Sequence, residues 1–137
     1  MSIVGILDAV PHRAPALILD EVVGADDESA CCAFTVREGF FVDDGRLAPE
    51  ALIEALAQTA AVMGGLRARR HGAALLRGLL AGVRGFSIER TPAVGDRVVC
   101  RVQTVRRLGE ISLVNGFACD DDGPICAGEF KFHETLQ

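Results

Sequence analysis

The stretch APEALIEALAQTAAVMGG, residues 48–65, decides the fold. Nearly every residue in it is apolar. Pro49 suits the first position of a helix, and Glu50 suits the positive end of the helix dipole. Because apolar residues run round the whole helix, we expect it to be buried on most of its faces. We expect this helix to end at Gly72, after a basic last turn.

Segments typical of β-strands flank this helix on both sides. Runs of apolar and β-branched residues, separated by glycine, proline and aspartate turns, predict strands at 16–25, 30–37, 75–89, 96–107, 111–120 and 125–134. Between them, 39–47 is predicted to be a loop whose turn is made by Asp43, Asp44 and Gly45. The order β-β-α-β-β-β-β predicts an α+β protein, a single domain over 1–137, in which an antiparallel sheet wraps around one long central helix. That architecture is the hot-dog fold.

The alternation in 96–107 gives the sheet an inner and an outer face. Val98, Cys100, Val102 and Thr104 fall on one side of this strand, and Val99, Arg101, Gln103 and Val105 fall on the other. A short amphipathic turn is also expected at residues 3–10, ahead of Pro11.

Composition excludes several classes of function. The net charge of −5 and the absence of a basic tail argue against nucleic-acid binding. No apolar run is long enough to span a membrane, and the first residues lack a secretion signal, so we expect a cytoplasmic protein. Five cysteines without a C-x-x-C spacing favour buried thiols over disulfides or zinc. Nucleotide-binding and hydrolase motifs are absent.

Glu54 is the unusual residue of the helix. Burying an unpaired carboxylate costs several kcal/mol, so Glu54 must be partnered, neutral or beside an aqueous pocket. Gln58, four residues on, lies on the same helical face and could hydrogen-bond to it. Two interpretations are open: Glu54 reaches solvent or pairs with an arginine at a dimer interface, or it is a carboxylate that donates and accepts a proton.

His12 is the candidate partner for such a carboxylate. It lies in PHRAP, between two prolines that restrict the backbone just ahead of a strand. A histidine in a loop is either simply exposed to solvent or aimed at a cleft, where it would serve as an acid or base. His71 and His133 are weaker candidates. Several arginines form either a solvated face or a grip on the phosphate of a carrier or coenzyme: Arg67, Arg69, Arg70, Arg84 and Arg90.

Three segments together resemble a known family. PHRAPALILDEVVG resembles the PHR-x-P-x-LL-x-D-x-V segment of bacterial 3-hydroxyacyl-acyl carrier protein dehydratases. LAPEALIEALAQTAAVMGG resembles their P-G-x-L-I-x-E-A-x-A-Q helix, and LLAGVRGFSIERTPAVGDRVVCRV resembles the strand, P-x-x-x-GD turn and strand that follow. The resemblance covers essentially the whole chain, in order.

The resemblance implies a hot-dog homodimer, or a dimer with a related hot-dog subunit, whose active sites lie at the interface beside an acyl tunnel. A helix carboxylate, here Glu54, would remove water from a 3-hydroxyacyl thioester together with a histidine, giving a trans-2-enoyl thioester. The substrate would be carried on acyl carrier protein or coenzyme A, without metal or redox cofactor. The expected substrate-binding residues are Gln58, Phe41, Leu80, Gly82 and Val83.

The chain departs from the family's pattern in one place. The usual catalytic histidine lies in a G-H-F-P motif before the helix, whereas here that loop reads FFVDDGRLAP and has no histidine. The shorter loop and the retained N-terminal PH are more similar to the dehydratases of aryl polyene biosynthesis. His12 is then the expected substitute. Two alternatives are an acyl-binding or partner subunit without catalysis, and an acyl-CoA thioesterase.

Overall fold

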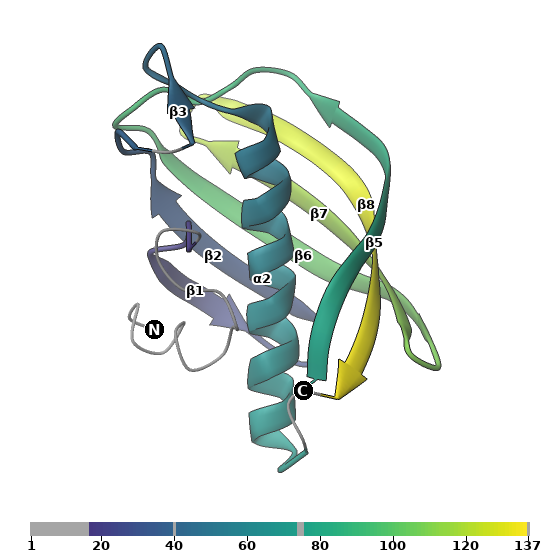
Figure 1. The fold of residues 1–137 in the computed structure, drawn as a ribbon. Helices are drawn as coiled ribbons and strands as arrows, with labels where there is room; N and C mark the ends of the chain where they lie inside the picture. Colours follow the sequence, from purple (N-terminus) through teal and green to yellow (C-terminus); the bar gives the residue numbers. More distant parts are fainter. Residues whose placement is uncertain (1–16, 40, 74–75, 137) are drawn as a thin grey trace.

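One long helix lies across the inner face of a curved sheet in the computed structural model, which describes residues 17–39, 41–73 and 76–136 (Figure 1). This helix, α2, spans Pro49–Arg70, with Pro49 in its first turn as the sequence predicts. His71 is its C-cap, and Gly72 follows with a positive φ of 62°. The residues expected to form a turn at 3–10, and His12, lie outside the described residues.

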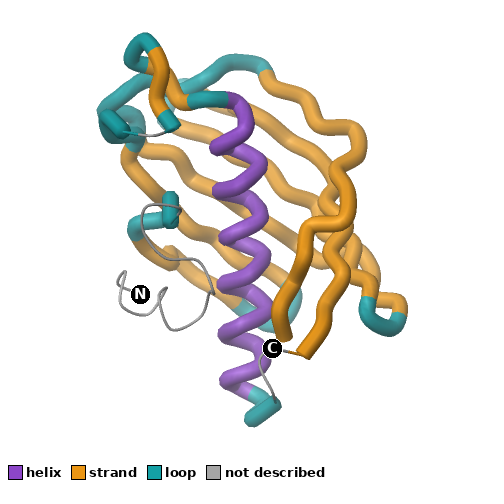
Figure 2. The backbone as a smooth tube through the Cα atoms, viewed as in Figure 1, coloured by secondary structure: helices purple, strands orange, loops and turns teal. Residues whose placement is uncertain are grey.

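Six antiparallel strands form the main sheet (Figure 2). Its spatial order is β1-β2-β6-β7-β8-β5, so β5 leaves the helix, runs to the far edge and pairs with the last strand. These strands are β1 (Glu21–Ala25), β2 (Ser29–Thr35), β5 (Leu76–Ile88), β6 (Arg97–Leu108), β7 (Ile111–Asp120) and β8 (Gly123–Leu136). The six predicted strands and the central helix follow one another along the chain in the predicted order, and the fold is a hot dog.

Two details differ from the sequence-based prediction. The first strand begins at Glu21, and the described part of the predicted segment ahead of it, residues 17–20, is not strand, because the backbone N–H groups of Ile18 and Leu19 donate to the side chain of Gln58 instead of a neighbouring strand. The predicted loop at 39–47 contains a small hairpin, β3 (Val42–Asp43) paired with β4 (Arg46–Leu47). Its turn residues Asp44 and Gly45 both have positive φ, the geometry that an Asp-Gly hairpin turn requires.

The core fills the space between α2 and the inner face of the sheet. On β6 the predicted alternation holds: Val98, Cys100 and Val102 are buried while Arg101 and Gln103 are exposed. Each aliphatic side chain buried in this layer contributes about 1.5–3 kcal/mol relative to an exposed one. The largest fully buried apolar side chains come from the helix, from several strands and from the segment ahead of β1, and they include Leu19, Leu52, Leu56, Val62, Val98, Val114, Ile125 and Phe130.

The helix is buried on most of its circumference, as its apolar composition predicts. The residues with partial exposure follow one another at helical spacing and form one side of α2: Ile53, Glu54, Ala57 and Ala61. Within the described residues no helix is both long and apolar enough to cross a membrane.

Strand β5 forms one edge of the sheet and is exposed along most of its length. Bulges interrupt its pairing with β8 between Leu80 and Gly82 and between Arg84 and Ser87, and Gly85 has a positive φ of 63°. Four of its large apolar side chains are more than a third exposed: Leu79, Leu80, Val83 and Ile88. An unpaired edge of this kind is a surface on which another strand can add.

Candidate active site

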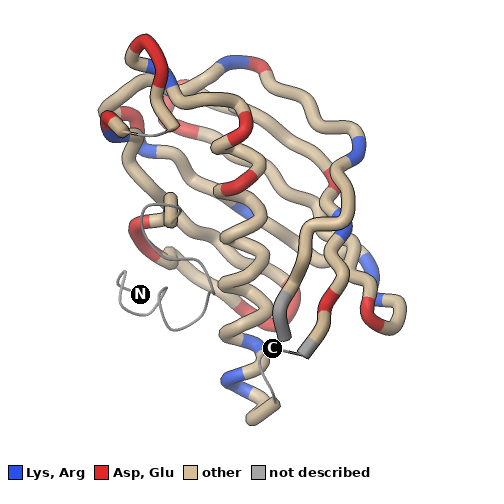
Figure 3. The backbone as a smooth tube through the Cα atoms, in the orientation of Figure 1, with Lys and Arg blue, Asp and Glu red and all other residues tan. Residues whose placement is uncertain are grey.

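Glu54 occupies the second turn of α2 on the less buried side of the helix. Figure 3 shows that the acidic positions of the helix lie toward its beginning and the basic ones at its end. One carboxylate oxygen of Glu54, Oε1, accepts a hydrogen bond from Gln58 Nε2 at 3.2 Å, the contact that their spacing predicts. A half-buried carboxylate beside apolar neighbours, held by a neutral donor, can carry a proton or accept one.

The start of α2 is anchored by the backbone rather than by a side-chain cap. The N-cap residue, Ala48, makes no side-chain cap, and its N–H donates to the Phe41 carbonyl oxygen at 2.7 Å. The N–H of Leu47 donates to the Pro92 carbonyl oxygen at 2.9 Å. These two bonds fix the segment before the helix, and they place half-buried Phe41, an expected substrate-binding residue, beside the first turn of α2.

The other expected substrate-binding residues lie on β5 and α2. Strand β5 contacts the helix, and it carries Leu80 and Val83, which are 40% and 37% exposed, with partly exposed Gly82 at the first bulge. Gln58 is fully buried in α2. The structure therefore joins Glu54 directly to Gln58, and sets Phe41 at the helix start and the other three residues on the neighbouring edge strand. His12 lies outside the described residues.

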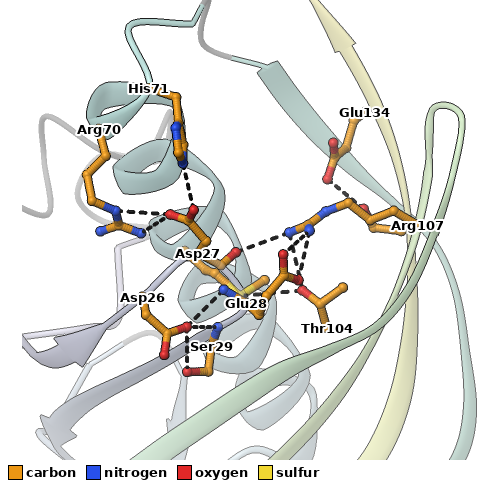
Figure 4. Close-up of polar contacts among 11 residues, drawn as sticks. Asp26, Asp27, Glu28, Ser29, Arg70, His71, Thr104, Arg107 and Glu134 are labelled. Atoms are coloured by element: carbon orange, nitrogen blue, oxygen red, sulfur yellow. Dashed lines mark hydrogen bonds and ion pairs between the residues drawn. The ribbon is translucent and has the colours of Figure 1, made fainter.

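A second polar cluster lies at the opposite end of α2 (Figure 4). Asp27 accepts hydrogen bonds from Arg70 at 3.0 Å and pairs with His71 Nε2 at 2.6 Å, and these contacts, His71 first, lower the pKa of Asp27. Arg107 binds the Glu28 carboxylate on the same turn. At 1.5 Å per residue this end is about 24 Å from Glu54. The cluster ties the β1–β2 turn to the end of the helix and belongs to a separate part of the molecule.

Three of the arginines considered for phosphate binding are engaged within the chain. Arg70 pairs with Asp27, Arg84 pairs with Glu129, and Arg90 pairs with Asp120. His133 Nε2 lies 2.9 Å from the Glu110 carboxylate, and both side chains are exposed.

The three buried thiols are poor candidates for a nucleophile. All five cysteines are free, three of them buried, and Cys31 and Cys119 are only partly so. Burial raises the pKa of Cys32 to about 12 and that of Cys126 to about 11, and it raises the pKa of Cys100 well above its usual value. Thiols of this kind stay protonated and unreactive. Among the residues that the structure describes, no three His, Cys, Asp or Glu side chains gather into a metal site.

Comparison with known proteins identifies the family. Residues 4–127 match the ApeP-like family, described as "ApeP dehydratase". The 3-hydroxyacyl-[acyl-carrier-protein] dehydratase FabZ of Lactococcus lactis subsp. cremoris is 30% identical over 96% of this chain and 94% of its own. The enzyme of the same name from Streptococcus equi subsp. zooepidemicus is 32% identical over 93% of this chain and 92% of its own.

Two solved structures show the same fold. "The Dehydratase Heterocomplex ApeI:P from Xenorhabdus doucetiae" contains a chain that superposes with a TM-score of 0.88 at 21% identity, covering 96% of this chain and 91% of that one. A hypothetical thioesterase with coenzyme A from Streptococcus pneumoniae gives a TM-score of 0.71 at 13% identity, with coverage of 85% and 86%.

The fold is that of the hot-dog proteins. Within that class, the chain belongs to the ApeP-like dehydratase family and is similar to the FabZ dehydratases.

Proposed function

We propose that this protein removes water from a 3-hydroxyacyl thioester carried on acyl carrier protein, giving the trans-2-enoyl thioester, in fatty acid or polyene and polyketide biosynthesis. The observation that carries the proposal is the Glu54 carboxylate, which is half-buried on the less buried side of α2 and accepts a hydrogen bond from Gln58, in a chain of a dehydratase family.

The reaction needs one base and one acid. Neutral His12 would take the proton from the carbon α to the thioester carbonyl, and protonated Glu54 would deliver its proton to the β-hydroxyl, which leaves as water as the double bond forms. Apolar surroundings favour a protonated carboxyl group, which suits Glu54 to the acid step. The two roles could also be exchanged. Backbone N–H groups near Gly82 or Gly85 would hold the thioester carbonyl.

The exposed edge strand supports assembly with a second hot-dog subunit. Strand β5 offers unpaired backbone along one edge, together with the apolar side chains of Leu79, Leu80 and Val83. Pairing with β5 of an identical chain, or of a related subunit, would cover these side chains, of which Leu80 and Val83 are candidate substrate-binding residues. Light scattering on the purified protein distinguishes a homodimer from a monomer that awaits a different partner.

The decisive experiment is a turnover assay on purified protein with 3-hydroxyacyl-acyl carrier protein, following the enoyl product by mass spectrometry. Glu54→Gln and His12→Ala are each expected to reduce the rate by about 10²-fold or more, since each removes an acid or base. Release of free thiol without enoyl product would instead identify a thioesterase. Absence of both reactions, with acyl carrier protein still bound, would identify a non-catalytic subunit.

A further inference from the structure

Gln58 is a fully buried polar side chain in the middle of α2. Its amide makes contacts on two sides. Oε1 accepts hydrogen bonds from the backbone N–H groups of Ile18, at 2.9 Å, and Leu19, at 3.4 Å. Nε2 donates to Glu54 Oε1 at 3.2 Å. A buried amide in a helix needs such partners, since an unsatisfied one costs about 1–3 kcal/mol.

The backbone donors determine which way the amide points. Two N–H groups face one atom of the Gln58 side chain, so that atom must be the carbonyl oxygen, which only accepts. The NH2 group is then directed at Glu54. The reverse orientation would place donors against donors and an oxygen against a carboxylate oxygen.

This side chain joins two parts of the chain that are distant in sequence. Gln58 is separated by 40 residues from Ile18, whose segment leads into β1. His12, the candidate base, precedes Ile18 by six residues in the sequence. One amide therefore connects the candidate acid with the segment that follows the candidate base.

We propose that Gln58 is a positioning residue that acts through Glu54 rather than a residue that contacts the substrate. Gln58 holds the Glu54 carboxylate in one orientation. When Glu54 is protonated, its proton lies on Glu54 Oε2, because Glu54 Oε1 faces the N–H donor of Gln58. This inference rests on the proposed dehydratase function, but it makes a separate prediction about Glu54 itself.

Two variants and a control test this role. Gln58→Leu removes both the donor to Glu54 and the acceptor for the backbone. Gln58→Glu keeps an acceptor and the side-chain length but places a second carboxyl group against Glu54. Thr59→Val is the matched control, because Thr59 is equally buried on the next position of α2, and its hydroxyl donates to the Ala55 carbonyl oxygen at 2.8 Å.

The direct measurement is a ¹³C NMR titration of the Glu54 carboxyl carbon, assigned with Glu54→Gln. In Gln58→Leu the midpoint should rise, since a donor to the ionised form is lost. In Gln58→Glu two neighbouring carboxyl groups should titrate in two coupled steps. Thr59→Val should leave the midpoint unchanged. If the Glu54 titration is the same in either folded Gln58 variant as in the wild type, the positioning role is wrong.

Turnover separates this role from substrate contact and from the function itself. Gln58→Leu should lower kcat by about 10- to 100-fold, the range expected for misplacing a catalytic group, with KM nearly unchanged. An effect confined to KM would contradict the proposal. If the wild type shows no dehydration while the Glu54 titration still responds to Gln58, the proposed function fails and the positioning role stands.

Discussion

Gly116 and Phe130 provide a quantitative test of how the core is packed. A Cβ at Gly116 would lie 3.1 Å from Phe130 Cε1 and 3.4 Å from Leu56 Cδ2. The Phe130 ring has little room to move, because it is 1% exposed and packs edge-on to Phe86 and parallel to Phe132, with ring centroids 6.2 and 6.4 Å away. The space taken by the ring is therefore the space left by the missing side chain at Gly116.

Gly116→Ala should accordingly destabilise the fold. Overpacking a filled core costs about 1–3 kcal/mol, and replacing glycine in a strand returns about 0.5–1 kcal/mol, so the net loss lies between about 0 and 2.5 kcal/mol, with its centre near about 1 kcal/mol. Phe130→Leu should lose about 1–3 kcal/mol from its two aromatic contacts. Because leucine leaves room for the new methyl group, the double variant should be more stable than the sum of the single losses by about 1 kcal/mol.

Urea denaturation at one fixed protein concentration measures these differences. Gly78→Ala is the control, since a Cβ there meets no atom within 4 Å, and it should show only the gain of about 0.5–1 kcal/mol from replacing glycine in a strand. Losses at Gly116 and Phe130 that add within about 0.3–0.5 kcal/mol would refute the packing argument.

Two further predictions concern charge and thiols. Arg90 lowers the pKa of Asp120 through their ion pair, so Asp120 stabilises the fold above the unfolded value near 3.9 and loses this effect as the pH falls below it. Asp120→Asn should therefore destabilise the protein at pH 7, with the difference shrinking below about pH 4, whereas Asp121→Asn on the exposed turn should show little change in urea titrations. For the thiols, a colorimetric disulfide reagent at pH 8 should label Cys31 and Cys119 in the native protein and the other three only after denaturation. Rapid labelling of all five cysteines in the native protein would contradict the burial of Cys32, Cys100 and Cys126.

Much of the fold follows from local sequence signals. The helix over Pro49–Arg70 combines a proline start, a basic last turn and an apolar circumference, and each signal acts within a few residues. The alternation of β6 predicted correctly which side chains face the helix. The spatial order of the sheet rests instead on long-range pairing, such as β5 with β8, which local patterns do not specify.

The site was predictable only in part. The spacing of Glu54 and Gln58 indicates their hydrogen bond, because residues four apart share a helical face. The bonds from Ile18 and Leu19 to Gln58 cross 40 and 39 residues, and they replace strand pairing at the point where the sequence alone predicts a strand. The apolar and β-branched composition of this segment favours a strand, but its backbone N–H groups donate to the buried Gln58 amide of the helix and not to a neighbouring strand.

The role of Glu54 in dehydration is tested by the rate of enoyl thioester formation from 3-hydroxyacyl-acyl carrier protein, measured for the wild-type protein and for Glu54→Gln. We expect turnover by the wild type and a loss of about 10²-fold or more in the variant, with both proteins equally folded. Equal rates in the two proteins would show that the Glu54 carboxylate is not the proton donor or acceptor of the reaction.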